Sequence, residues 1–157
     1  MRTLRPAKRL FPILLIVILT VALSVTAFAA PEDFYFNLSN TGTTVQVYTG
    51  SSNIKTVQTN PASIGLANTD APGYGMLLHL VYWDGSRYTQ ATTSGWYNPN
   101  HFIDTEDYLS GCAVCGRYYY IAGRIDNDYY GTYTTSGRYN ADIIKLFGNS
   151  NNQDWIM

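Results

Sequence analysis

The eight residues Met76-Leu77-Leu78-His79-Leu80-Val81-Tyr82-Trp83, followed by Asp84-Gly85, decide the fold. They are the most apolar segment outside the N-terminal region, and their length and composition predict a central strand covered on both faces. Asp84-Gly85 is a strong hairpin signal, because tight turns need residues that tolerate positive φ. Residues 87–92 then form the returning strand.

Alternating apolar and polar residues predict further strands on either side of this hairpin. Phe34, Phe36 and Leu38 alternate with polar neighbours and predict a first strand with one buried face. Residues 43–48 are expected to pair with a short strand at 55–59. The intervening stretch 60–75 is rich in Pro, Gly, Ala and Asn and reads as a long surface loop.

A second hairpin is predicted near the C-terminus. Residues 117–125 form a strand with Tyr119, Ile121 and Ile125 on one face, and 129–135 return after the turn at 126–128. Ser136-Gly137 predicts another turn, and 138–146 read either as a last strand or as one helical turn capped by Asn140. Short strands separated by turns predict an all-β fold, a small antiparallel β-sandwich or barrel after an N-terminal signal helix.

The first 29 residues have the layout of a signal peptide. Four basic residues fall within the first nine, an apolar run follows, and the segment ends on Ala27-Phe28-Ala29, a pattern that signal peptidase cleaves. A retained anchor is the alternative, since the apolar run approaches the length needed to span a bilayer. The sequence predicts one secreted β domain at 30–157, with membrane contact only through residues 1–29 before cleavage.

The charge balance of residues 30–157 excludes some partners. They contain eleven acidic and six basic residues, a formal charge of −5. Nucleic-acid binding needs a basic patch, so no nucleic-acid partner is expected. The many Tyr, Thr, Gly and Asn residues fit a sheet with frequent turns.

Cys112-Ala113-Val114-Cys115 is the sharpest local motif. In an exported protein two cysteines normally form a disulfide, so a structural Cys112–Cys115 bond is expected. The alternative is an extracellular thiol-disulfide oxidoreductase, which needs one cysteine at a helix N-terminus to lower its pKa. Metal binding needs further soft ligands, and only two histidines exist.

Catalytic motifs are absent from the sequence, and no cofactor or metal is expected. His79 is interpreted as a core or edge residue of its strand. His101, Asp104 and Glu106 share one loop region and provide the only hypothesis of a small secreted hydrolase. The same acidic residues are equally well explained as a solvated turn.

The surplus of aromatic residues carries the main functional hypothesis. Exposed aromatic side chains bind sugars and proteins at low entropic cost, whereas ordinary cross-strand pairing is the alternative explanation. The candidate binding surface consists of Trp96, Tyr97, Tyr118, Tyr120, Tyr130 and Tyr133.

Two segments, residues 117–124 and residues 134–139, resemble small secreted β-sandwich proteins of Gram-positive bacteria. These include lactococcin-type bacteriocins and uncharacterised families encoded beside bacteriocin exporters. The chain differs from the lactococcin type in its length, its acidity and its cysteine pair. The resemblance implies a secreted β-sandwich and a bacteriocin-related role, with no catalytic residues. The expected function is therefore non-enzymatic binding to cell-envelope glycan or protein.

Overall fold

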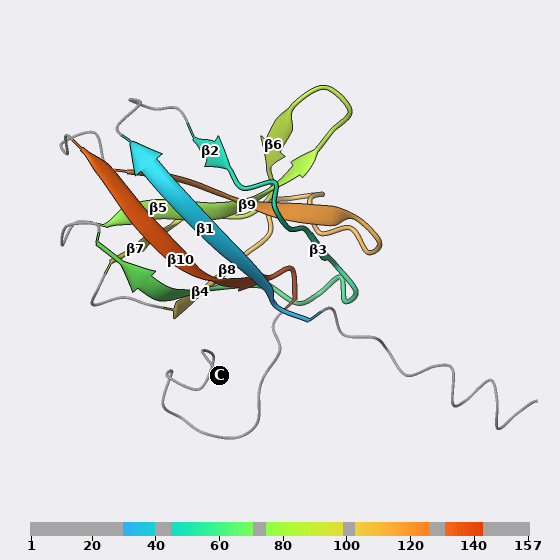
Figure 1. Ribbon diagram of the computed structural model, residues 1–157. Helices are drawn as coiled ribbons and strands as arrows, with labels where there is room; N and C mark the ends of the chain where they lie inside the picture. Colours follow the sequence, from blue (N-terminus) through green and yellow to red (C-terminus); the bar gives the residue numbers. More distant parts are fainter. Residues whose placement is uncertain (1–29, 40–44, 71–74, 99–102, 126–130, 143–157) are drawn as a thin grey trace, which may run out of the picture.

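The fold is an all-β sandwich of two antiparallel sheets, as the sequence predicts (Figure 1). The computed structural model describes residues 30–39, 45–70, 75–98, 103–125 and 131–142. Those residues form ten strands and no helix, so nothing within them can cross a membrane as an apolar helix. The predicted signal peptide at 1–29 lies outside the described residues.

The first sheet has the strand order β1-β10-β4-β8. It pairs the first described strand, β1 (Glu32–Ser39), with the last, β10 (Thr132–Asn140). β4 (Ala62–Thr69) follows, and β8 (Ile103–Glu106) forms the edge. The alternation in β1 points Phe34, Phe36 and Leu38 inward, where all three are buried.

The second sheet has the order β2-β9-β5-β6, with two short strands added to its edges. Its centre is β9 (Tyr118–Ile125) paired with β5 (Met76–Trp83), which matches the predicted central strand residue for residue. The short strands are β2 (Gln46–Val47), β3 (Asn53–Ile54), β6 (Tyr88–Gln90) and β7 (Gly95–Tyr97).

The hydrophobic core fills the space between the two sheets. β1 packs against β9 and β4 packs against β5, so apolar side chains from both inner faces meet. From the second sheet, Leu78 and Leu80 of β5 meet Ile121 of β9 within this cluster. Each such side chain contributes roughly 2 kcal/mol when it is removed from water.

Three strand predictions are wrong. Residues 60–75 are not a loop, because Ala62, Ile64 and Leu66 alternate inward and make β4 an interior strand of the first sheet. The segment before it does not form a hairpin with β2, since β2 and β3 each pair with β9 instead. Non-local pairing satisfied backbone groups that a local turn was expected to serve.

The second predicted hairpin is also wrong. β10 does not return beside β9 but joins the opposite sheet between β1 and β4. Ser136-Gly137 is no turn; it lies inside β10, where the register with β4 shifts at a bulge. Gly137 fits there because an added Cβ would overlap the carbonyl oxygen of Gly65 and lie 2.8 Å from the Phe34 ring.

Candidate functional site: an aromatic face on the second sheet

The outer side of the second sheet carries most of the exposed aromatic rings of the described residues. In β5 the even-numbered residues face the core, so Leu77, His79, Val81 and Trp83 face outward. The register pairs outward Trp83 with Tyr88 of β6. We call this surface the outer aromatic face; its rings are Trp83, Tyr88, Trp96, Tyr118 and Tyr120.

One end of the outer aromatic face is a cluster of interlocking rings. The Trp83 and Tyr88 rings lie 5.1 Å apart at 64°, and the Tyr88 and Tyr120 rings lie 5.3 Å apart at 77°. Such edge-to-face contacts are favourable beyond the burial of area and hold the rings in fixed orientations. Trp83 is still 51% exposed and Tyr118 55%, so the cluster offers ring surface to a ligand.

The β5–β6 turn holds two of these rings in place. The Asp84 carboxylate accepts hydrogen bonds from the backbone N–H groups of Ser86 and Arg87 and from the hydroxyls of Ser86 and Thr89. These bonds keep the pKa of Asp84 well below its usual range, because they stabilise the ionised form. Gly85 adopts a φ of 104°, as the turn prediction requires.

The other end of the outer aromatic face combines a tryptophan with an arginine. Leu77 pairs with Trp96 on one side and with Arg124 on the other. The Arg124 guanidinium carbon lies 5.7 Å from the centre of the Trp96 ring, within range of a cation–π contact. Six residues of β5 separate this end from Trp83, a distance of about 20 Å at the usual rise of a strand.

Polar groups lie between the two ends. The Ser94 hydroxyl is 3.3 Å from His79 Nδ1 and accepts a 3.0 Å bond from the Gln90 amide. Burial, followed by the nearby charge of Arg124, lowers the pKa of His79 to about 4. A neutral imidazole of this kind is a weak general base at pH 7, so this pair serves recognition better than catalysis.

The structure separates the six residues of the predicted binding surface. Trp96, Tyr118 and Tyr120 lie on the outer aromatic face. Tyr97 is wrong as a surface residue, because it points into the core and its hydroxyl donates to Glu106 Oε1. Tyr133 belongs to the first sheet and is half-buried against the core, and Tyr130 lies outside the described residues.

Sequence reasoning missed Trp83 and Tyr88. The signal for them was available in the predicted hairpin itself. The residues that flank a hairpin turn face each other across the two strands. Two aromatic residues at those positions therefore indicate an exposed ring pair.

The predicted disulfide is absent, and both cysteines are free thiols. The chain turns between Val114 and Arg117, and this directs the two sulfurs to different neighbours. Cys112 Sγ lies 4.0 Å from the Gln90 carbonyl oxygen, whereas Cys115 Sγ donates a 3.4 Å bond to the Thr56 carbonyl oxygen. Cys115 is exposed and Cys112 is partly covered by the core.

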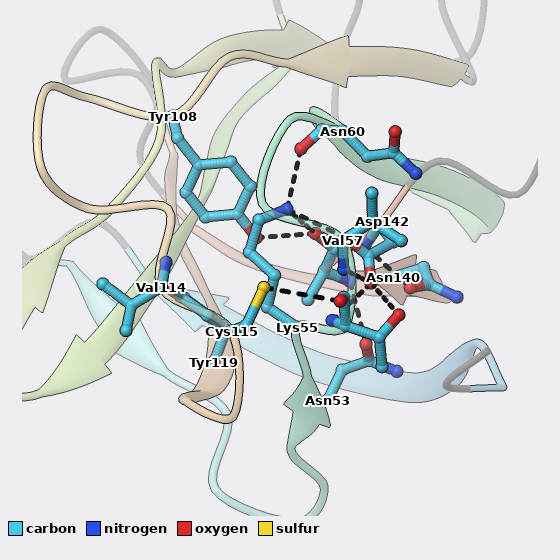
Figure 2. Close-up of polar contacts among 12 residues, drawn as sticks. Asn53, Lys55, Val57, Asn60, Tyr108, Val114, Cys115, Tyr119, Asn140 and Asp142 are labelled. Atoms are coloured by element: carbon cyan, nitrogen blue, oxygen red, sulfur yellow. Dashed lines mark hydrogen bonds and ion pairs between the residues drawn. The ribbon is translucent and has the colours of Figure 1, made fainter. Parts of the chain in front are cut away.

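A buried ion pair lies beside the cysteine loop (Figure 2). Lys55 Nζ is 3.0 Å from Asp142 Oδ1, and both side chains are at most 1% exposed. Lys55 also donates to the carbonyl oxygens of Asn60 (2.7 Å) and Ala141 (3.0 Å), and its ammonium lies 4.1 Å from the centre of the Tyr108 ring.

The carboxylate of this pair is equally well satisfied. Asp142 Oδ2 accepts 2.7 Å bonds from the Thr56 backbone N–H and hydroxyl, and Oδ1 accepts from the Val57 N–H. Burial raises the pKa of Asp142, but the bonds from Thr56 and the charge of Lys55 outweigh it and leave the pKa below its ordinary value. This cluster fastens residues 53–60 to the end of β10 and leaves no free donor for a ligand.

The hypothesis of a hydrolase loop gains nothing from the described residues. Glu106 points into the protein, is 3% exposed, and accepts bonds from Tyr97 and from the Thr93 hydroxyl. The backbone of Asp104 pairs with that of Ile64, and His101 lies outside the described residues. Within the described ranges, no three His, Cys, Asp or Glu side chains gather as metal ligands.

The geometry of the outer aromatic face is therefore the main guide to function. No protein-family model, no curated protein and no solved structure matches this chain.

Proposed function

We propose that this chain is a secreted, non-enzymatic domain that binds a polysaccharide of a cell envelope through its outer aromatic face. The observation that carries the proposal is the ring cluster of Trp83, Tyr88 and Tyr120, fixed by mutual contacts beside exposed Tyr118. A rigid ring cluster on a sheet loses little entropy when a flat ligand covers it.

The chemistry of a sugar ring suits this surface. Pyranose rings present an apolar face of C–H groups that packs on aromatic rings, while their hydroxyls need hydrogen-bonding partners. Gln90, which is exposed, and Ser94, which is partly exposed, supply such partners between the two aromatic ends. A polysaccharide chain laid along β5 meets rings at both ends and polar groups in the middle.

The test is binding of the purified domain to insoluble cell-wall polysaccharide, compared among three variants. Trp83→Ala and Tyr120→Ala each remove a ring from the cluster, and we expect about a tenfold loss of affinity from roughly 1.5 kcal/mol per ring. Tyr35→Ala is the matched control, because Tyr35 is 54% exposed but lies on β1 of the opposite sheet. Equal losses in all three variants, or no binding to any polysaccharide, would count against the proposal.

Secretion is part of the proposal. The Asn53 side-chain amide donates a 2.6 Å bond to the Ala30 carbonyl oxygen, so the fold holds the chain from the residue that follows the expected cleavage site. N-terminal sequencing of the protein from culture medium is expected to begin at Ala30. The resemblance to bacteriocin-associated proteins adds the expectation that the bound polymer belongs to a Gram-positive cell envelope.

The free thiols support a second candidate function, thiol-disulfide exchange. The exposed Cys115 thiolate would attack a partner disulfide, and Cys112 would then displace the partner as a thiol and leave a Cys112–Cys115 disulfide. An insulin-reduction assay with Cys115→Ser and Cys112→Ser variants tests this candidate. An inactive wild-type protein with two titratable thiols would eliminate it.

A further inference from the structure

The outer aromatic face carries one isolated positive charge. Within the strands of the second sheet Arg124 is the only formally charged residue, because His79 stays neutral above its lowered pKa. The ion pairs formed between described residues are Lys55–Asp142, Arg87–Asp84 and Arg138–Asp33, and none of them includes Arg124. In a domain with nearly twice as many acidic as basic residues, an arginine without a carboxylate partner is notable.

The position of Arg124 adds a second observation. Its guanidinium lies over Trp96, at the end of the face opposite the ring cluster, rather than on a polar surface of the first sheet. A guanidinium beside an aromatic ring keeps its donors directed outward, where they match the two oxygens of a carboxylate. An anionic group and a sugar ring can therefore occupy this end together.

We infer that the outer aromatic face selects carboxylated polysaccharides, polymers that contain hexuronic acid units, with Arg124 binding the carboxylate beside Trp96. This inference rests on the proposed function. A hexuronic acid keeps the ring face that Trp83 and Trp96 require and adds the anion that Arg124 requires. A phosphodiester-linked polyol supplies the anion without the rings, and a neutral glycan supplies the rings without the anion.

The experiment compares polygalacturonate with the same polymer after full methyl esterification, which removes the charge and keeps the backbone. The wild-type protein is expected to bind the acid form about five- to tenfold more tightly, as a charge-assisted pair at a partly exposed site allows. Arg124→Gln should bind both forms equally, and Arg124→Lys should keep part of the preference because it keeps the charge but loses the fork.

Arg87→Gln is the matched control. Arg87 is strongly exposed but sits on the β5–β6 turn and pairs with Asp84, so its loss should leave the preference unchanged. Trp83→Ala should weaken binding to both forms by the same factor. Thermal unfolding of each variant shows whether it is folded, and Arg124→Lys remains informative if Arg124→Gln fails to fold.

The outcomes separate the inference from the proposed function. Equal binding of both polymers by the wild-type protein overturns the inference but leaves polysaccharide binding intact. A preference for the acid form that survives in Arg124→Gln also overturns it, because the selectivity then lies elsewhere. Failure of the wild-type protein to bind any polysaccharide removes the proposed function and this inference with it.

Discussion

Lys55 shows what a buried charge requires in a small β domain. Its ammonium has three oxygen acceptors and an aromatic ring, and its partner Asp142 has donors on both oxygens. Taking either ion out of water costs several kcal/mol, and only a full set of partners offsets this cost. The pair therefore specifies one arrangement of two distant segments more than it adds stability.

A double-mutant cycle tests this reading of the pair. Lys55→Met or Asp142→Leu alone should lower the free energy of unfolding by about 3–5 kcal/mol, since each leaves a buried charge without its partner. The double variant should recover most of that loss. Urea denaturation measures all four proteins, and additive losses would mean that the two charges are not coupled.

His79 predicts how stability depends on pH. Its folded-state pKa of about 4 lies below its ordinary value of 6.5, so the unfolded chain takes up a proton first. The stability is complete above pH 6.5 and falls as the pH decreases to about 4, by roughly 3 kcal/mol at 1.4 kcal/mol per pH unit. His79→Gln should flatten the curve between pH 6.5 and 4.5. His101→Gln serves as the comparison, and an unchanged curve in His79→Gln would refute the assignment.

At the scale of single elements, the β5–β6 hairpin is where local sequence and structure agree. The apolar run of β5 and the turn residues Asp84 and Gly85 specify it without help from distant residues. Elements whose pairing is distant were harder to predict. β4 was read as a loop because Pro61, Gly65 and Asn68 outweighed the alternation of its apolar residues.

The partner of β10 follows from packing between distant segments, which periodicity does not encode. The turn-like residues 126–128 favoured a local hairpin, but β10 buries its inner face by lying between β1 and β4. The candidate site was half predictable for the same reason. The outward face of β9 follows from alternation, whereas the fate of Tyr97 depends on a Glu106 contact across sheets.

The bulge in β10 makes Gly137 a sensitive position. In Gly137→Ala the new methyl group collides with the Gly65 backbone, so the two strands must separate, and we expect a loss of about 3 kcal/mol. Gly111→Ala is the control: the space around it is open, and only its φ of 75° costs about 1 kcal/mol. Chemical denaturation compares them, and equal losses would contradict the close approach described for β10 and β4.

At the scale of the whole molecule, the topology sets the folding rate. The first described strand pairs with the last along eight residues, and β4 reaches across to the same strand. Sheets built from such distant partners fold in milliseconds to seconds, because loop closure precedes the contacts that reward it. Stopped-flow refolding followed by tryptophan fluorescence should give a main phase in this range; a microsecond phase that carries the full amplitude would contradict it.

The seam between β1 and β10 has a consequence for biogenesis. A nascent chain cannot zip this seam until residue 140 has left the ribosome, so the polypeptide stays loose throughout its own synthesis. A translocation channel that accepts only unfolded substrate would thus receive it without the help of an unfolding motor. Locking would then await the far side of the membrane, where the final strand arrives.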